Sequence, residues 1–246
     1  MQIAKSLASL SQEMSFGQHF WPADQSAAID KFDHSISQLF DPAVKVNLKA
    51  GDHLFHMSQP YTGCYRLERG LIKTVLSSQE GRETITGIFG PSALLGVLSI
   101  LDRKPHIASV IALTDCCLSY VAHNALSEHL KRNPDVLTYF VKFLITCVRQ
   151  CNEMRAAETF MTAKQRVGYA LLEFSKHAGQ KNDNGSTFMR EKISQSDLAA
   201  MAGVARENVS RVLNDWRRRD LVTLSSRYYC IRDMTALLGE IFPKKH

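Results

Sequence analysis

The sequence of 246 residues lacks the features that mark several large classes of protein. No apolar run reaches the roughly 18 residues that a membrane-spanning helix needs, and the first residues show no apolar signal-peptide core. The six cysteines form no Cys-x-x-Cys pair and no zinc-finger spacing. We therefore expect a cytoplasmic protein with reduced thiols, no bound metal and no contact with a membrane.

The chain also lacks the short motifs that carry enzyme chemistry. It contains no Gly-x-Ser-x-Gly, no phosphate-binding loop, no His-Glu-x-x-His and no glycine-rich dinucleotide fingerprint. Its histidines and carboxylates are scattered, without a spacing that would bring them together. We therefore expect that the protein is not an enzyme.

Positive charge is the first feature that the chain does have, and it is unevenly distributed. Residues 1–159 contain 15 Lys and Arg against 15 Asp and Glu, whereas residues 160–246 contain 15 against 9. The whole formal surplus of +6 therefore lies in the last third of the chain. A local basic surplus of this kind is typical of a segment that binds the phosphates of nucleic acid.

Within this basic third, the segment ISQSDLAAMAGVARENVSRVL (residues 193–213) predicts two short helices joined by a glycine turn. Ser194 can cap the first helix, with Asp197 as an imperfect capping-box partner. Gly203 stands where the turn needs a left-handed backbone. This pattern is typical of a helix-turn-helix, whose second helix enters the major groove of DNA. An ordinary helical hairpin with a solvated charged face is the alternative.

The second helix of this segment has an apolar face and a polar face, as the 3.6-residue period requires. The apolar face comprises Val209, Val212, Leu213 and Trp216. The polar face includes Arg206, Glu207, Ser210 and Arg211. An Arg can donate two hydrogen bonds to guanine, and a Glu can accept one from cytosine. We therefore predict that these four polar residues contact the bases of double-stranded DNA.

The rest of the chain divides into segments that differ in their pattern of apolar and polar residues. Short β-type runs punctuated by glycine extend from Val44 to about Val121 and predict a compact antiparallel sandwich or roll. A long helical pattern follows from Asn133 to about Phe160, and a further helix is expected over 164–177. The polar stretch 177–187 predicts a surface loop between helices. Two apolar runs around Ser225-Ser226-Arg227 predict a short hairpin, or wing, at the phosphate backbone.

The fold class expected from these parts is α+β. A roll domain with a helical or irregular preamble is expected over residues 1–132, with the preamble over 1–43. A dimerisation helix and hinge should occupy 133–161, and a winged helix-turn-helix should occupy 162–246. The long helix carries an apolar stripe with steps of three and four residues, which includes Val136, Phe140, Phe143, Leu144, Val148 and Met154. A second copy of the chain is the obvious partner for this stripe, so we predict a homodimer.

This order of parts resembles the Crp/Fnr family of bacterial transcription regulators over roughly residues 44–235. The most specific parts are Arg206-Glu207-x-Val209-x-Arg211, Leu-Glu-Arg-Gly-Leu-Ile at 67–72 and Asn133-Pro134 before the long helix. The resemblance implies a cyclic-nucleotide-binding-like jelly roll that binds an effector, and helices that dimerise. It also implies a joint near 160–163 through which effector binding reorients the DNA-binding parts.

On the DNA side, the resemblance implies an inverted repeat with a TGA core, contacted by Glu207 and Arg211. RNA polymerase is an expected partner if the protein is an activator. Several residues match positions that touch phosphate in the family and would position the protein without selecting a sequence. These residues are Ser194, Asn208, Ser225 and Arg227.

The sequence departs from the family's pattern at the effector site. A cyclic-AMP pocket in this family has a Gly-Glu-Leu segment and an Arg-Ser pair, where this chain has Gly96-Val97-Leu98 and His106-Ile107. Valine cannot accept a hydrogen bond from ribose, and a phosphate buried without arginine would remain uncompensated. Cyclic AMP is therefore not the expected effector. The first cysteine, Cys64, lies too far along the chain for the N-terminal iron–sulfur cluster of Fnr-type proteins.

Several hypotheses remain for the ligand or signal that controls the protein. A small apolar molecule could bind in a pocket of the roll, or the same aliphatic side chains could pack as an ordinary core. The proposed pocket comprises Leu95, Val97, Leu98, His106, Ile107, Cys147, Cys151 and Asn152, together with Leu94 and Ile100. Cys147 and Cys151 could instead form a thiol switch, although such cysteines more often fill a core. Haem bound by His19, His53, His56 or His106 is a weaker alternative, as is a ligand-binding module that does not bind DNA.

Overall fold

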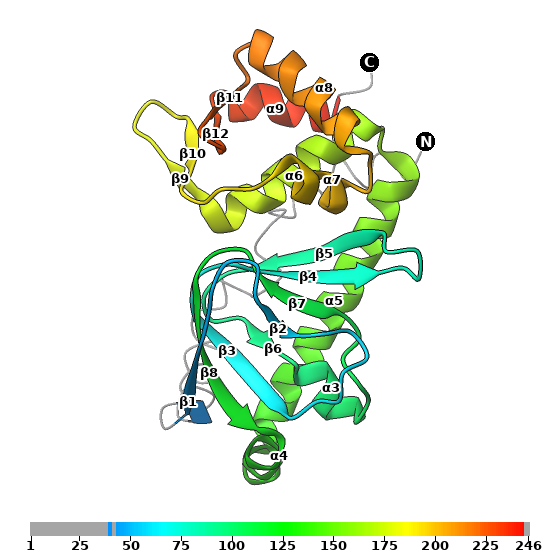
Figure 1. The fold of residues 1–246 in the computed structure, drawn as a ribbon, viewed down its shortest axis with the longest axis vertical. Helices are drawn as coiled ribbons and strands as arrows, with labels where there is room; N and C mark the ends of the chain where they lie inside the picture. The colour runs from blue at the N-terminus through cyan, green and yellow to red at the C-terminus, as the bar shows by residue number, and fades with distance from the viewer. Residues whose placement is uncertain (1–38, 41–42, 244–246) are drawn as a thin grey trace. The chain divides into compact units, whose positions relative to one another are not determined.

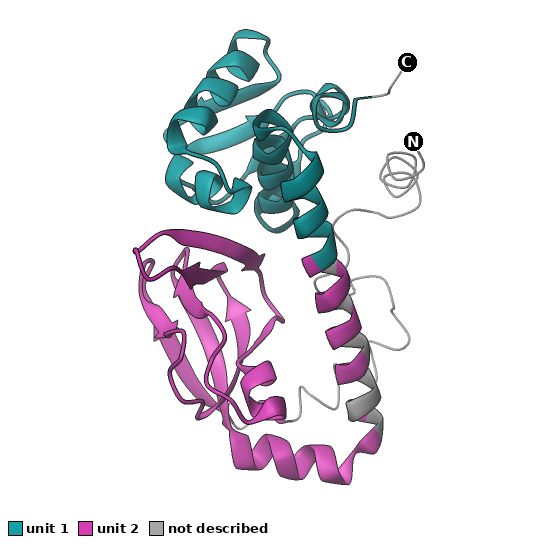
Figure 2. Ribbon diagram, turned by 90° about the vertical axis from the view of Figure 1, so that its right-hand side faces the viewer, with its two compact units in different colours: residues 1–18, 152–246 teal, residues 19–151 magenta. Residues whose placement is uncertain are grey.

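A computed structural model describes residues 39–40 and 43–243. The chain divides into two compact units, which Figure 2 shows in different colours. We call the described residues up to 151 the N-terminal unit and residues 152–243 the C-terminal unit. The preamble expected over residues 1–43 lies outside the described residues, apart from a short helical piece at Leu39 and Phe40 and the single residue Ala43.

The N-terminal unit is built on two four-stranded sheets whose strands pair antiparallel (Figure 1). The first sheet has the order β1-β8-β3-β6, with strands Val44–Leu48, Cys116–Ala122, Gly63–Arg69 and Leu94–Leu95. The second has the order β2-β7-β4-β5, with strands His53–Phe55, Ser109–Ala112, Ile72–Ser77 and Glu83–Phe89. The roll predicted from the glycine-punctuated runs is confirmed.

One apolar cluster draws on both sheets of the roll. Leu67 of β3, Ile72 of β4 and Leu118 of β8 have no exposed surface and belong to it. Because strand side chains alternate between the two faces of a sheet, each sheet can direct one apolar face inward. This cluster is the hydrophobic interior of the roll.

A second apolar cluster joins the roll to helices. The N-terminal unit contains α3 (Val97–Asp102), α4 (His123–Arg132) and the first part of α5 (Pro134–Phe160). The cluster consists of Phe40, Cys64, Val97, Ile100, Val121, Leu126, Val136 and Phe140. The long helix expected to run to about Phe160 is therefore present, and the two units divide within it, between residues 151 and 152.

The C-terminal unit combines helices with one small sheet. Its helices after α5 are α6 (Ala163–Ala178), α7 (Gln195–Ala202), α8 (Arg206–Arg218) and α9 (Met234–Ile241). Its sheet has the order β11-β12-β10-β9, with strands Val222–Ser225, Tyr228–Ile231, Thr187–Met189 and Gly179–Lys181. The loop expected over 177–187 is wrong in part: β9 and β10 form a hairpin, and only 182–186 connects them.

Across the described ranges, 39–40 and 43–243, we find no helix with the length and apolar character to cross a membrane. Within the same ranges, no three His, Cys, Asp or Glu side chains are grouped so that they could hold a metal ion.

Candidate nucleic-acid interface

Helix α7 begins and ends as the sequence predicts. At its start the backbone N–H of Asp197 donates to Ser194 Oγ at 2.9 Å, and the Ser194 hydroxyl donates to the Asp197 carboxylate at 2.6 Å. At its end Gly203 has φ +60°, and its N–H donates to the carbonyl of Ala199. This left-handed residue turns the chain sharply, so that α8 starts three residues later.

Helix α8 separates its apolar and polar side chains cleanly. Val209, Leu213 and Trp216 are buried, whereas Val212, expected on the same face, is half-buried. The structure places all four predicted base-contacting residues toward the N-terminal end of this helix. Arg206, Glu207 and Arg211 are exposed, and Ser210 is half-buried. The helix therefore presents a polar surface of both charges to solvent, anchored from behind by its apolar side.

Arg211 contacts Asn208, a residue that the sequence analysis predicted to contact a DNA phosphate. Its guanidinium donates a hydrogen bond to the side-chain oxygen of Asn208, one turn earlier in α8. Because guanidinium has five N–H groups, this bond leaves donors for a guanine edge. Asn208 is therefore placed to orient Arg211, a role that the sequence analysis missed; the three-residue spacing of an amide and an Arg on one helix could have indicated it.

The predicted wing is a tight hairpin of β11 and β12. Ser225 pairs with Tyr228, and the two residues between them, Ser226 and Arg227, have φ of 50° and 71°. Two positive φ values are what a type I′ turn requires, so the tip is sharply turned and Ser225 and Arg227 are exposed. The Nζ of Lys192 lies 5.1 Å from the centre of the Tyr228 ring, which connects the wing to the segment that leads into α7.

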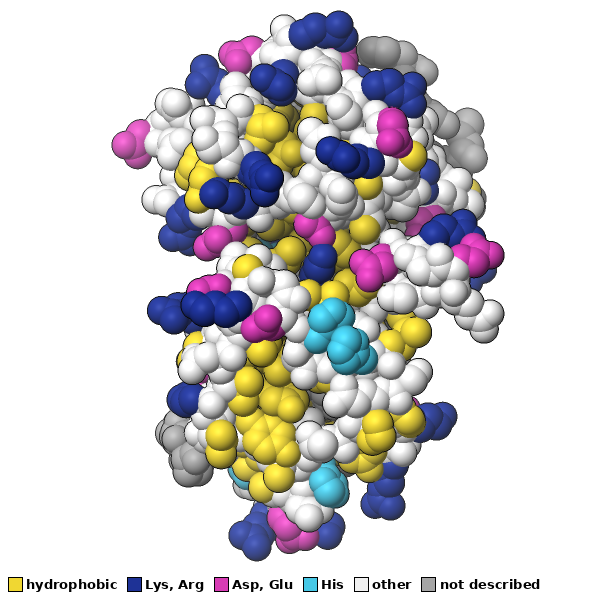
Figure 3. Space-filling model, in the orientation of Figure 1, with side chains coloured by type: hydrophobic (Ala, Val, Ile, Leu, Met, Phe, Trp, Pro, Cys, Tyr) yellow, Lys and Arg dark blue, Asp and Glu magenta, His cyan; other side chains and the backbone are white. Residues whose placement is uncertain are grey.

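The cations of the C-terminal unit differ in how far they are compensated. Lys and Arg side chains are scattered over the face in Figure 3. Arg218 and Arg219 at the end of α8 pair with Asp215 at 3.5 and 3.4 Å. Within the described part of the chain, neither Arg206 nor Arg227 takes part in an ion pair. Uncompensated exposed cations are the ones that can attract and contact phosphate or base edges.

The predicted effector residues do not form one surface. Leu95 belongs to the interior of the roll and Val97 to the cluster under the helices, at 4% and 2% exposure. Leu98 is half-buried, whereas Ile107 is 59% exposed. The arrangement matches core packing for the buried aliphatic side chains more closely than the lining of an open pocket.

His106 is the one buried ionisable group among the predicted effector residues. Its ring stacks on Phe55 with centroids 3.6 Å apart, and its Nδ1 lies 3.0 Å from Ser99 Oγ. Burial lowers the pKa of His106, so the ring is neutral at neutral pH. Gly96, with φ +84°, allows this arrangement, because a Cβ there would lie 2.9 Å from the carbonyl oxygen of Gly63 and 3.5 Å from the His106 ring. A neutral imidazole cannot replace the arginine that balances a cyclic phosphate.

Cys147 of α5 lacks the reactive thiolate that a thiol switch needs. All six cysteines are free thiols. Burial, with Cys151 nearby, raises the pKa of the Cys147 thiol to about 11, so Cys147 stays protonated and is a weak nucleophile at neutral pH. Cys151 and Asn152 are exposed. Of the histidines named for haem, His53 and His56 stack on each other with ring centroids 4.1 Å apart, and His19 lies outside the described residues.

One part of the apolar stripe of α5 is buried within its own chain, and another part is exposed. Val136 and Phe140 pack into the core of their own chain, at 5% and 2% exposure, so they are not free to contact a second copy. Farther along, Leu144 is 36% exposed and Val148 is 61% exposed. Met154 is half-buried, and the side chain of Phe143 lies outside the described part. The sequence analysis missed Val141 and Ile145, which are 49% and 50% exposed.

Two family models match the chain in the order of these parts. The cyclic nucleotide-binding domain matches residues 45–133, and the Crp-like helix-turn-helix domain matches residues 165–239. Together they cover more than half of the chain. The chain belongs to the Crp/Fnr family. It is a DNA-binding transcription regulator with an α+β fold, and the helix-turn-helix match includes α7, α8 and the wing.

Individual relatives agree with this assignment. A CRP-like cAMP-activated global transcriptional regulator of Mycobacterium tuberculosis is 25% identical over 203 residues, which cover 82% of this chain and 90% of that protein. The transcriptional activator protein Anr of Pseudomonas protegens is 27% identical over 195 residues, covering 78% and 79%. The structure of FixK2 from Bradyrhizobium japonicum shares the fold, with a TM-score of 0.71 at 18% identity, over 80% of this chain and 96% of that one. The first two of these relatives are named as a regulator and an activator of transcription.

Proposed function

We propose that two copies of this Crp/Fnr regulator bind a twofold inverted repeat with a TGA core. In each copy, Arg206, Glu207 and Arg211 contact the bases and Ser210 assists. The observation that carries the proposal is the division of α8, whose apolar side is buried while the charged side chains of its first two turns are exposed. Arginine matches guanine and glutamate matches cytosine, as the G·C pair of the core requires.

The phosphate contacts complete this interface. Ser194 stands at the N-terminus of α7, where backbone N–H groups and the helix dipole favour an anion. Ser225 and Arg227 lie at the exposed tip of the wing, and Asn208 lies beside Arg211. Ser194, Ser225 and Arg227 hold the protein on the duplex without selecting a sequence, so their loss should weaken binding to every duplex alike. Loss of Asn208 should also reduce selectivity, because Asn208 orients Arg211.

Dimer formation rests on the exposed part of the α5 stripe. Val141, Leu144, Val148 and Cys151 follow one another at steps of three and four residues, which is the a/d spacing of a two-stranded coiled coil. Analytical ultracentrifugation should find a dimer for the parent and a monomer for Val148→Glu. Val44→Glu, at a 65% exposed valine of β1, is the matched control and should remain a dimer. A dimeric Val148→Glu protein would rule out this stripe as the interface.

The effector, in this proposal, is not cyclic AMP, although the name of the M. tuberculosis relative states that it is cAMP-activated. Val97 is buried in a core cluster and His106 is neutral, so neither can satisfy a ribose or a cyclic phosphate. The first candidate is a largely apolar molecule bound in or near the roll. A ligand-independent regulator is the second candidate, which the burial of Leu95 and Val97 as core favours. RNA polymerase would be the partner of an activator.

Fluorescence anisotropy on a TGA-core inverted repeat and on a scrambled duplex, at one salt concentration, tests the proposal. Preference for the repeat without any additive is the result expected of a ligand-independent regulator. Preference that appears only with cyclic AMP would refute the argument about the effector. Dependence on reductant would support control through Cys147 and Cys151. Equal binding of both duplexes in all these conditions would contradict a ligand-independent regulator of a TGA-core repeat.

A further inference from the structure

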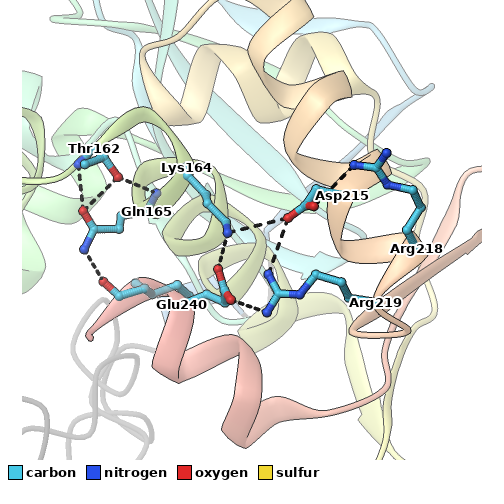
Figure 4. A network of polar contacts seen from close by, with 8 residues as sticks. Thr162, Lys164, Gln165, Asp215, Arg218, Arg219 and Glu240 are labelled. Atoms are coloured by element: carbon cyan, nitrogen blue, oxygen red, sulfur yellow. Dashed lines mark hydrogen bonds and ion pairs between the residues drawn. The ribbon is translucent and has the colours of Figure 1, made fainter. Parts of the chain in front are cut away.

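Helices α6, α8 and α9 meet at a network of charged side chains, which Figure 4 shows. Glu240 of α9, with an 18% exposed side chain, lies at its centre. Its carboxylate pairs with Lys164 in the first turn of α6 and with Arg219, the residue that follows α8. Asp215 of α8 contacts the same two cations, 3.6 Å from Lys164 and 3.4 Å from Arg219. Two carboxylates and two cations therefore join three helices.

A second polar connection joins α6 to α9 beside this network. Thr162 caps α6, and its backbone N–H donates to Oε1 of Gln165 at 2.8 Å. The Nε2 of the same Gln165 donates to the carbonyl oxygen of Ile241 at 2.9 Å. One side chain therefore holds the first turn of α6 and also satisfies a carbonyl at the end of α9, which the helix itself leaves unpaired.

The three helices also pack closely beneath these polar contacts. Gly168 of α6 lies close to the other two helices: a Cβ there would lie 2.5 Å from Cγ1 of Ile241 and 3.1 Å from Cη2 of Trp216. Trp216 and Ile241 are 0% and 1% exposed. We call this assembly of charged network and buried contacts the α6–α8–α9 junction.

We propose that Glu240 is a positioning residue for DNA recognition: through Lys164 and Arg219 it sets the orientation of α8 relative to the start of α6. The inference rests on the proposed base contacts of α8, and it adds α9 to the parts of the chain that determine sequence specificity. Helix α6 begins at Ala163, shortly after α5 ends at Phe160. The junction therefore includes a residue, Lys164, that stands four positions beyond the end of α5.

The exposure of the network indicates a geometric role rather than a large contribution to stability. The side chains of Lys164 and Arg219 are 39% and 45% exposed, and ion pairs at such sites add little to the free energy of unfolding because solvent screens them. Pairs that bridge three helices can nevertheless restrict how those helices pivot. The hydrogen bond from Arg219 lowers the pKa of Glu240 to about 2, with Lys164 assisting, so the carboxylate is charged throughout the neutral range.

The test compares the ratio of dissociation constants, scrambled duplex over preferred duplex, in Glu240→Gln and in the parent. A change in net charge affects both duplexes alike and cancels in this ratio. We expect the ratio to fall about fivefold, a size typical of couplings within one charged network. Glu128→Gln is the matched control, because Glu128 also lies between two cations, Lys131 and Arg132 at 2.9 and 4.0 Å, but in the N-terminal unit. Its ratio should equal that of the parent.

Lys164→Gln removes the same ion pair from its more exposed side, and it should lower the ratio by a similar factor; circular dichroism and thermal unfolding establish that each variant is folded. The double variant should lose no more than the larger single loss. An unchanged ratio in a folded Glu240→Gln or Lys164→Gln protein, with the parent still selective, overturns the positioning role alone. A parent without sequence preference, or a selective Arg211→Ala protein, would instead overturn the assignment of α8 and this inference with it.

Discussion

The two units differ in what happens to the residues that their sequence singles out. In the C-terminal unit, Arg206, Glu207 and Arg211 stand exposed on one regular helix. In the N-terminal unit, Leu95 and Val97 are enclosed in apolar clusters, while Ile107 is exposed and apart from them. A polar helix face can be inferred from spacing alone, because the opposite face must be apolar. An aliphatic pocket cannot, because its lining has the same composition as a core.

The units also use charge differently. The helix-turn-helix leaves Arg206 and Arg227 without ion pairs in the described part of the chain, and these exposed cations can meet phosphate or base edges. On the roll, Glu68 is surrounded by groups that compensate it. Burial raises the pKa of Glu68, but hydrogen bonds from Ser119 and Arg66 and the charges of Arg66 and Lys45 outweigh this effect and lower it. The charge of Glu68 is thus compensated within the chain, whereas the charges of Arg206 and Arg227 are available to a ligand.

The largest expected effect is a loss of folding stability at Val97, and it tests whether the predicted effector residues of the N-terminal unit are core. If Val97 is core, Val97→Glu places a carboxylate at a 2% exposed position and should cost about 3–5 kcal/mol in the free energy of unfolding. Urea unfolding followed by circular dichroism measures this cost. Leu98→Glu, at the half-buried neighbour, should cost clearly less. Similar, small costs for both variants would mean that the site is a solvated pocket and that the contrast between the units is wrong.

Arg211→Ala should produce the next largest effect, and on DNA binding rather than on folding. Losing a bidentate contact with guanine should reduce discrimination by about 1–3 kcal/mol, which is roughly five- to more than a hundredfold in the ratio of affinities. Fluorescence anisotropy on preferred and scrambled duplexes measures this ratio. Arg82→Ala, in the β4–β5 hairpin of the N-terminal unit, is the matched control and should leave it unchanged. Full selectivity in Arg211→Ala would refute the predicted role of α8.

The free energy of unfolding should depend on pH through the buried His106 of the roll. Burial lowers the pKa of His106 in the folded chain below 6.5, the usual value for the unfolded chain. The unfolded state therefore binds more protons just below pH 6.5, so this contribution to stability is present above about pH 6.5 and is lost as the pH falls. Urea unfolding between about pH 7 and pH 5 should show a shallower decline in His106→Gln than in the parent. Equal slopes would place His106 in a more solvated site.

The smallest expected effect concerns the wing. Arg227→Ala should weaken binding to preferred and scrambled duplexes by the same factor, because a phosphate contact carries no sequence information. The slope of log affinity against log salt should decrease by about one unit. Titrations at several salt concentrations measure both quantities. A change in the ratio of affinities for the two duplexes would mean that Arg227 contacts a base. The wing would then select sequence as α8 does.

The parts that sequence analysis could predict are those with a strong local cause. Ser194 and Gly203 mark the ends of α7 by their chemistry, and the wing follows from two apolar runs around a short polar turn. Helix α4 was not predicted: it has only 10 residues, and Leu126 is its single fully buried residue. Strand β10 was also missed. Its pairing of Thr187 with Ile231 joins positions far apart in the chain, and the polar residues around the hairpin give no local sign of it.

The dimer stripe shows the same limit at the scale of single residues. Val136 and Val148 belong to one apolar pattern along α5, and nothing in their spacing distinguishes them. Val136 is buried by the roll of its own chain, whereas Val148 is 61% exposed and available to a second copy. Which partner covers an apolar side chain depends on tertiary packing, so the pattern predicts that a residue is covered but not by what.

Selection of duplexes from a random-sequence pool by the full-length parent protein tests the central claim most directly, because it assumes no operator in advance. We predict enrichment of twofold inverted repeats whose half-sites contain TGA, with centres about one helical turn of DNA apart. The same selection with Arg211→Ala should lose the guanine preference within that core. Enrichment of a single, asymmetric site without TGA, or an unchanged motif with Arg211→Ala, would contradict base recognition by the exposed face of α8.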